Sequence, residues 1–277
     1  MGGRVPHQGT WATTQPPFNK SGMITSTHNS KIQLVRGLLG RSKERRQTEA
    51  FVVEGVRLME EALRAEWPFR FVLRGESLSE RGRALMVELQ ACGVEAEIVA
   101  DNLMQSISET ETSQGILAVL DHSRLPIPQP LSFVLILDQI RDPGNLGTLL
   151  RTAAAAGVQA VFLPPETAEA FAPKVVRAGM GAHFRLPIHP LSWDEIRTTT
   201  QNLKIYLAEM GGTIPCWQAD FSSPLALIVG GEAEGASQPA RKLATSQVSI
   251  PMPGKSESLN AAAAGAILMF EVIRQRA

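Results

Sequence analysis

The sequence predicts a protein of the α/β class with two domains. Its 277 residues are 44% hydrophobic, and its 27 basic side chains balance 27 acidic ones. A chain this apolar folds rather than staying disordered, and its length suits two domains that each bury a core. Short apolar runs alternate with helical patterns along most of the chain, which is typical of α/β folds. Three prolines within residues 121–130 interrupt this alternation, and we place a linker at 122–130.

The first alternating series, residues 25–121, predicts a small α/β domain with a mainly parallel sheet. Apolar residues recur at helical spacing after residue 26, and the basic segment 41–47 that follows them predicts a solvated turn. Strands and helices then alternate, as they do around parallel sheets. Residues 1–24 are rich in Gly, Pro, Thr and Gln without periodicity, so we expect a disordered leader there. The expected strands are 51–53, 71–73, 94–99 and 115–120, and the expected helices are 56–65 and 79–92.

The second series, residues 131–277, predicts a parallel sheet that is buried on both faces. Its apolar runs at 133–137 and 225–229 are nearly continuous, whereas a strand with one face in water alternates apolar and polar residues. Helices must therefore cover both faces of this sheet. The expected strands are 133–137, 160–163, 205–208, 225–229 and 248–250, and the expected helices are 148–156, 173–180 and 259–276.

The composition excludes several classes of protein. An aromatic content of 5% argues against a surface that binds single strands by stacking. Cys92 and Cys216 are too far apart for a CxxC pair or a Cys/His cluster, so we expect no metal and two buried thiols. The longest apolar stretch, 261–270, is too short to span a bilayer, and the N-terminus lacks the apolar region of a secretory signal. We therefore expect a cytoplasmic protein without a membrane segment.

Three segments that contain glycine follow predicted strands, at the end of the sheet where α/β proteins bind ligands. They are residues 137–151, 229–235 and 250–260, and none of them matches the dinucleotide or phosphate-loop patterns G-x-G-x-x-G and G-x-x-x-x-G-K-[ST]. Taken singly, each has a purely structural interpretation. The candidates for such roles are Asn145 as a helix cap, Arg151 in a surface ion pair, Glu232 as a solvated carboxylate, and Ser256 or Ser258 as the cap of the last helix.

Taken together and in this order, the three segments resemble a known enzyme family. The stretches DPGNLGTLLRTA (142–153), IVGGEAEG (228–235) and IPMPGKSESLNAAAA (250–264) look like the three motifs of the SpoU-type, or TrmH-like, branch of the SPOUT methyltransferases. The stretch 174–188 matches the family's middle segment, except that Gly179 stands where relatives commonly have serine. Residues 26–120 resemble the small ribosomal-protein-like substrate-binding domain of many members. The resemblance thus covers most of the chain.

The resemblance implies a fold, an activity and a site. Its members transfer a methyl group from S-adenosylmethionine to a ribose 2′-hydroxyl of tRNA or ribosomal RNA. They fold as homodimers with a trefoil knot beside the cofactor, a feature that periodicity alone does not predict. For Arg151 the family suggests a general base, but a guanidinium stays protonated, so we favour phosphate binding and oxyanion stabilisation and leave proton acceptance open. By motif position the catalytic residues are Asn145, Arg151, Glu232, Ser258 and Asn260, and the cofactor-binding residues are Gly230, Ile250 and Leu259.

An RNA substrate requires local positive charge, although the net charge of the chain is zero. The first 43 residues contain six basic residues and no acidic one. We expect phosphate contacts from the basic run that follows, although a solvated helix end would look the same. The N-terminal domain favours ribosomal RNA over tRNA, and the alternatives are a non-catalytic RNA-binding or ribosome-assembly factor and an enzyme that methylates a base nitrogen. The predicted RNA-binding residues are Arg41, Lys43, Arg45 and Arg46, together with Arg151.

Overall fold

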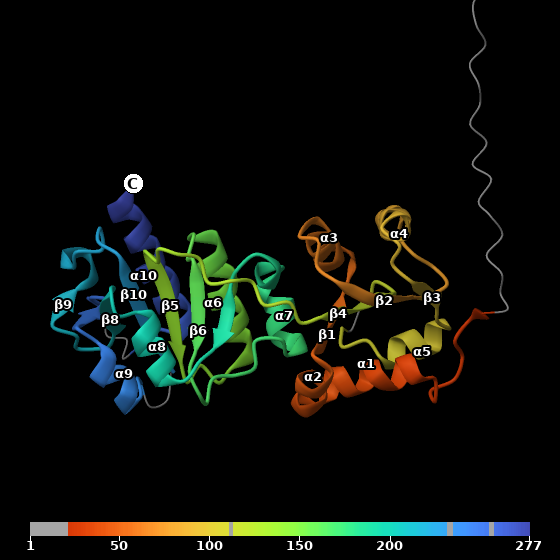
Figure 1. The fold of residues 1–277 in the computed structure, drawn as a ribbon, viewed down its shortest axis with the longest axis horizontal. Helices are drawn as coiled ribbons and strands as arrows, with labels where there is room; N and C mark the ends of the chain where they lie inside the picture. Colours follow the sequence, from red (N-terminus) through yellow and green to blue (C-terminus); the bar gives the residue numbers. More distant parts are fainter. Residues whose placement is uncertain (1–21, 111–112, 232–234, 255–257) are drawn as a thin grey trace, which may run out of the picture.

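A computed structural model describes residues 22–110, 113–231, 235–254 and 258–277. These residues form two lobes that lie side by side along the long axis of the molecule (Figure 1). The N-terminal lobe is built on a four-stranded sheet of order β1-β4-β2-β3. The C-terminal lobe is built on a seven-stranded sheet of order β7-β6-β5-β10-β8-β11-β9.

Helices cover both faces of the N-terminal sheet. Helices α3 and α4 pack on one face and α1 and α5 on the other, because alternate residues of each strand face opposite sides. The elements are α1 (Ser30–Gly40), α2 (Ser42–Thr48), β1 (Ala50–Glu54), α3 (Val56–Arg64), β2 (Phe69–Arg74), α4 (Glu80–Ala91), β3 (Ala96–Ile98), α5 (Asp101–Ser106) and β4 (Ile116–Asp121).

The prediction of a mainly parallel N-terminal sheet is wrong. Strand β4 lies between β1 and β2 and runs antiparallel to both, and the β2–β3 pair alone is parallel among the described strands of this sheet. Apolar patterning reports which residues are buried, but it carries no information about the direction of a strand.

Three local predictions for the N-terminal lobe also need correction. The basic segment that was expected to be a solvated turn forms helix α2. Cys92 is exposed at the end of α4, whereas Cys216 is buried as expected. Residues 1–21 of the predicted leader lie outside the described residues, but Ile24, within its predicted bounds, is buried and pairs with Val99.

The C-terminal sheet is parallel in every described pair, as predicted. Strand β9 and helices α8 and α9 were not predicted, because each is seven residues or shorter and lacks a clear period. Helix α6 begins at Pro143, five residues before the predicted start. The elements are β5 (Phe133–Asp138), α6 (Pro143–Ala155), β6 (Ala160–Leu163), α7 (Pro173–Gly179), β7 (Ile188–Pro190), α8 (Trp193–Thr199), β8 (Lys204–Ala208), β9 (Ile214–Pro215), β10 (Leu225–Gly230), α9 (Gln238–Leu243), β11 (Ser246–Ser249) and α10 (Ala261–Arg276).

The central strands of this sheet are apolar on both faces because helices cover both sides. In β5, Phe133, Leu135 and Leu137 face the core formed with α6, α7 and α10. The intervening Val134 and Ile136 face a second core formed with α8 and α9. Because neighbouring strands run parallel, their carboxyl ends lie at one edge of the sheet, and the three glycine-containing segments meet there.

The two lobes share a packed interface. Val176 and Phe184 of the C-terminal lobe are buried in the core beneath α3 and α4. The Phe184 ring meets the Trp67 ring edge to face with 5.3 Å between centroids. Helix α7 lies at this junction (Figure 1). Within the described ranges, no helix has the length and hydropathy needed to cross a membrane.

Candidate active site

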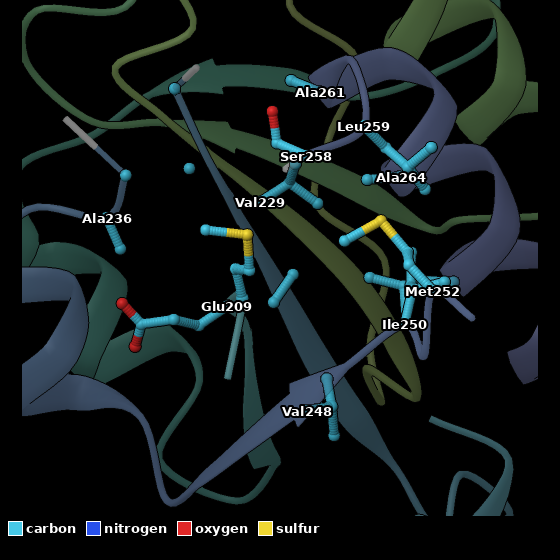
Figure 2. A pocket seen from close by; sticks show the side chains of 16 residues that line it. Glu209, Val229, Ala236, Val248, Ile250, Met252, Ser258, Leu259, Ala261 and Ala264 are labelled. Carbon is cyan, nitrogen blue, oxygen red and sulfur yellow. The ribbon is translucent and has the colours of Figure 1, made fainter. Parts of the chain in front are cut away.

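A cavity of about 350 Å³ opens at the carboxyl ends of β8, β10 and β11. Its walls are mostly apolar side chains and exposed backbone, and among its described lining residues Glu209 and Ser258 alone carry polar side chains. Figure 2 shows Glu209 and Ala236 across the cavity from Met252 and Ala264. Such a cleft can hold a flat apolar ring system and a few hydrogen-bonding groups.

The structure brings the predicted cofactor-binding residues together on this wall. Gly230 ends β10, Ile250 follows β11, and Leu259 precedes α10, and all three line the cavity. A Cβ atom at Gly230 would lie 2.9 Å from the backbone nitrogen of Ala236. The end of β10 and the returning chain are thus too close for any residue larger than glycine.

Asn145 and Asn260 join the first turns of two helices beside this cavity. Asn260 is the N-cap of α10, where its Oδ1 accepts hydrogen bonds from the backbone nitrogens of Ala262 at 2.9 Å and Ala263 at 3.2 Å. Its Nδ2 donates to Oδ1 of Asn145 at 3.0 Å. The caps that the sequence suggested are therefore wrong: α6 is capped by Asp142 rather than Asn145, and α10 by Asn260 rather than Ser258. Ser256, the other candidate for α10, lies outside the described residues.

The structure places the remaining predicted catalytic residues differently. Ser258 lines the cavity, directly before Leu259. Arg151 is exposed on α6, outside the cavity wall, and no hydrogen bond or ion pair holds its guanidinium among the described residues. Glu232 lies outside the described residues, between Gly231 and Gly235, which form an isolated bridge with each other.

A buried carboxylate that the sequence analysis did not select supports the loop after β10. Asp138, the last residue of β5, is fully buried, and its Oδ2 accepts a hydrogen bond from the Ser237 backbone at 2.6 Å. Its Oδ1 has no partner among the described residues. Burial raises the pKa of Asp138, while the hydrogen bonding to Ser237 opposes that rise. An acidic residue at the end of an otherwise apolar strand is the pattern that could have revealed it.

An ion pair ties two walls of the cavity together. Arg241 of α9 pairs with Glu209 at the exit of β8, and its Nε donates to the Ala236 carbonyl at 3.2 Å. Glu209 and Arg241 lie far apart in sequence, Glu209 directly after β8 and Arg241 within α9. No local pattern reveals such a contact.

The predicted RNA-binding run divides into two groups. Arg41, Lys43 and Arg46 are exposed, whereas Arg45 is buried. The Arg45 guanidinium donates to both carboxylate oxygens of Glu169, at 2.8 and 2.7 Å, and to the Leu38 carbonyl at the end of α1. The prediction that Arg45 contacts RNA is therefore wrong, because one side of α2 faces the C-terminal lobe and Arg45 lies on that side.

Comparison with known proteins gives consistent matches over both lobes. A family model described as "SpoU rRNA Methylase family" matches residues 132–270, and one described as "MRM3-like substrate binding domain" matches residues 29–118. The chain is 33% identical over 255 residues to the 23S rRNA (guanosine(2553)-2′-O)-methyltransferase of Bacillus subtilis, covering 90% of this chain and 98% of the relative.

Solved structures show the same arrangement of both lobes. The SpoU methyltransferase AviRb of Streptomyces viridochromogenes, in complex with the cofactor AdoMet, matches with a TM-score of 0.79 at 30% identity, over 90% of this chain and 99% of that one. The AdoMet-bound rRNA methyltransferase of Sinorhizobium meliloti matches with a TM-score of 0.81 at 28% identity, over 91% and 97% of the two chains.

Proposed function

The chain belongs to the SpoU rRNA methylase family, and we propose that it methylates a ribose 2′-hydroxyl of ribosomal RNA at the cavity beside α10. It is an enzyme, and S-adenosylmethionine is its methyl donor. The observation that carries the proposal for the site is the convergence of three distant segments: the Asn145–Asn260 hydrogen bond lies beside a cavity lined by Gly230 and Ser258. A non-catalytic assembly factor would not need this arrangement.

The cavity fits S-adenosylmethionine in size and chemistry. Its apolar walls suit the adenine ring, and the crowded backbone at Gly230 offers main-chain groups without an intervening side chain. We propose that Gly230, Ile250 and Leu259 hold the nucleoside, and that Ser258 with the two asparagines holds the polar methionine end and the target hydroxyl. All three of these side chains are neutral hydrogen-bonding groups, which suits both tasks.

S-adenosylmethionine supplies a methyl group that is already activated on a sulfonium centre. The protein must therefore align one ribose oxygen with that methyl and manage one proton. Asn145 and Asn260 are fixed to each other and to α10, so a hydroxyl that binds them is held in a defined position. We propose that Glu232, outside the described residues, orients the loop that it belongs to.

For Arg151 we propose phosphate binding next to the target ribose and stabilisation of the oxyanion that develops there. Its exposure on α6, outside the cavity wall, supports contact with RNA. Arg151→Lys keeps the charge but not the two parallel hydrogen bonds. Losing one charge-assisted hydrogen bond costs about 1.5–3 kcal/mol, so we expect kcat/KM to fall roughly 10- to 150-fold. An unchanged kcat/KM would show that a point charge is sufficient.

We propose that the RNA binds along the N-terminal lobe. A polar cavity of about 940 Å³ in this lobe is lined by Arg57, Arg81 and several hydroxyl and amide side chains. Arg41, Lys43 and Arg46 add exposed positive charge near α2. If Arg41, Lys43 and Arg46 contact phosphates, replacing all three with glutamine should weaken RNA binding and flatten its dependence on salt concentration. An unchanged salt dependence would contradict this assignment.

We further propose a homodimer that acts in the cytoplasm. Three large apolar side chains near or on α10, Leu259, Ile267 and Phe270, are 36%, 44% and 51% exposed. An apolar surface of this kind is typical of a subunit interface. The cytoplasmic location rests on the ribosomal RNA substrates of the bacterial relatives. Sedimentation equilibrium at several protein concentrations tests the dimer, and a monomer throughout would refute it.

The test of the proposed activity has two parts. Purified protein with tritium-labelled S-adenosylmethionine should label ribosomal RNA transcribed in vitro, and alkaline digestion should leave the label in a dinucleotide that resists hydrolysis. Label recovered on a base instead would indicate methylation of a ring nitrogen. Mapping 2′-O-methylation in cells with and without the gene then identifies the nucleotide.

A further inference from the structure

Helix α7 packs against the cores of both lobes at once. Val175 is buried in the core of the C-terminal lobe with residues of α6. The next residue, Val176, is buried in the core of the N-terminal lobe with Phe51 and Leu58. A movement of α7 would therefore disturb two close-packed cores, which makes it a rigid connection between the lobes.

On its other side, α7 lies in direct backbone contact with α6. A Cβ atom added to Gly147 of α6 would lie 2.5 Å from the Ala178 Cβ and 2.6 Å from the Val175 carbonyl oxygen. Gly147 stands between Asn145 and Arg151, the two residues of α6 assigned to the site. The orientation of α7 consequently fixes the orientation of the helix that carries both of them.

Toward the N-terminal lobe, α7 is held by an ion pair to Glu109, which lies between Ser108 and Thr110 of the polar cavity lining. Arg177 Nη1 lies 3.1 Å from Glu109 Oε2, with the two side chains 37% and 33% exposed. The Glu109 backbone and the neighbouring Thr110 hydroxyl donate to the Glu54 carboxylate at 3.1 and 2.7 Å. Thr110 in turn lines the polar cavity.

We propose that Arg177 is a positioning residue that sets the distance between RNA bound in the N-terminal lobe and the Asn145–Asn260 pair. The Glu109–Arg177 ion pair joins α7 to the segment whose Ser108 and Thr110 line the polar cavity, and α7 packs in turn against α6. This inference rests on the proposed function, because it requires an RNA that contacts both lobes. Methyl transfer needs close alignment of the ribose oxygen with the methyl group. A small shift of α6 therefore lowers kcat more than it weakens RNA binding.

The chain offers a matched control. Arg185 Nη1 lies 2.7 Å from Glu61 Oε2 and also joins the two lobes, with side chains 58% and 20% exposed. Neither residue belongs to α7 or is adjacent in sequence to a residue that lines the polar cavity, whereas Glu109 lies between two such residues. If the two ion pairs act only by holding the lobes together, removing either pair should lower kcat to the same extent. If Arg177 positions α6, only the removal of the Glu109–Arg177 pair should lower kcat.

The test compares Glu109→Gln, Arg177→Gln, their double variant and Arg177→Lys with Arg185→Gln. The assay measures kcat and KM for in vitro transcribed ribosomal RNA with labelled S-adenosylmethionine. We expect either single glutamine variant to lower kcat roughly two- to fivefold, the range of a partly exposed ion pair, with KM for RNA within twofold. The double variant should be no slower than either single one, because both remove the same interaction. Arg177→Lys should retain most of the activity, and Arg185→Gln all of it.

Calorimetry should give the same cofactor affinity for all variants. A fall in kcat for Arg185→Gln equal to that for Arg177→Gln would overturn the proposal, as would additive single effects or a change in KM alone. Hydrogen exchange provides a second readout without catalysis: residues 144–151 of α6 should exchange faster in Arg177→Gln than in Arg185→Gln, and equal rates would also overturn it. If the wild-type protein labels no RNA, the proposed function fails, while the exchange measurement still tests the contact between α7 and α6.

Discussion

His183 should make the stability of the fold depend on pH in a defined window. The side chain is fully buried, and its Nε2 lies 2.8 Å from the Ala170 carbonyl, so Nε2 carries the proton of the neutral ring. The other nitrogen, Nδ1, has no partner among the described residues. Burial lowers the pKa of His183 from 6.5 to about 4. Protonation would place an unpaired charge between the lobes.

The sign and size of the effect follow from this pKa. In the unfolded chain the imidazole titrates near pH 6.5, so between pH 6.5 and 4 the unfolded state binds more protons than the folded state. The free energy of unfolding should therefore fall as the pH falls through this window, and the His183 contribution should become constant below about pH 4. A pKa shift of this size corresponds to roughly 3 kcal/mol in total. His122, whose pKa burial also lowers, adds a decrease of the same sign.

Chemical denaturation at a series of pH values from 7 to 4 measures this dependence. His183→Gln keeps a hydrogen-bond donor for the Ala170 carbonyl but does not titrate, so its stability should vary less with pH than that of the wild type. His28, which is exposed, provides the control variant His28→Gln, expected to follow the wild type. Parallel curves for the wild type and His183→Gln would refute the argument.

Three further predictions concern stability and the site. Gly147→Ala should lower stability by about 1–3 kcal/mol, because the added Cβ meets the backbone of α7, whereas Gly40→Ala meets no atom within 4 Å and should be harmless in thermal denaturation. Asn260→Ala should lower stability by about 1 kcal/mol, because the helix cap is lost, and should remove most of the methylation rate. Asn260→Asp should restore the cap but not the rate, since a carboxylate cannot donate to the Asn145 amide on α6. Arg45→Met should lower stability by about 1–3 kcal/mol and speed proteolysis between the lobes, because it leaves a partly buried carboxylate unpaired, whereas Arg46→Met should change neither.

The sequence predicted the elements whose burial follows a simple rule. The apolar run that became β5 has no polar residue because helices cover both faces of the strand, and the same rule identified β10. The convergence of the glycine-containing segments could also be predicted, since parallel strands end at one edge of a sheet. The direction of the strands locates that edge, and the roles of the individual residues come from the family resemblance.

Features that depend on contacts between distant elements could not be predicted in this way. Arg45 belongs to a basic run that looks solvated, yet its partner Glu169 is 124 positions away in the other lobe. Nothing local distinguishes it from its exposed neighbour Arg46. The direction of β4 could not be predicted for the same reason: it is determined by the strands with which β4 pairs and not by the residues of β4 itself. Asp138 lies within the first glycine-containing segment, but its burial and its contact with Ser237, 99 positions away, depend on the fold of the loop after β10.

Asn260 combines a structural role, as the N-cap of α10, with the functional role proposed for the last motif. Its Oδ1 accepts from the first turn of α10, so its Nδ2 must face Oδ1 of Asn145. The orientation of the Asn145 amide is thereby fixed as well, because its oxygen is the required acceptor. Helix capping thus determines the orientation of both amides, and the folding of α10 and the proposed alignment of a substrate hydroxyl depend on the same hydrogen bonds. An alanine at position 260 removes both functions together, and a side chain that accepts but does not donate is needed to separate them.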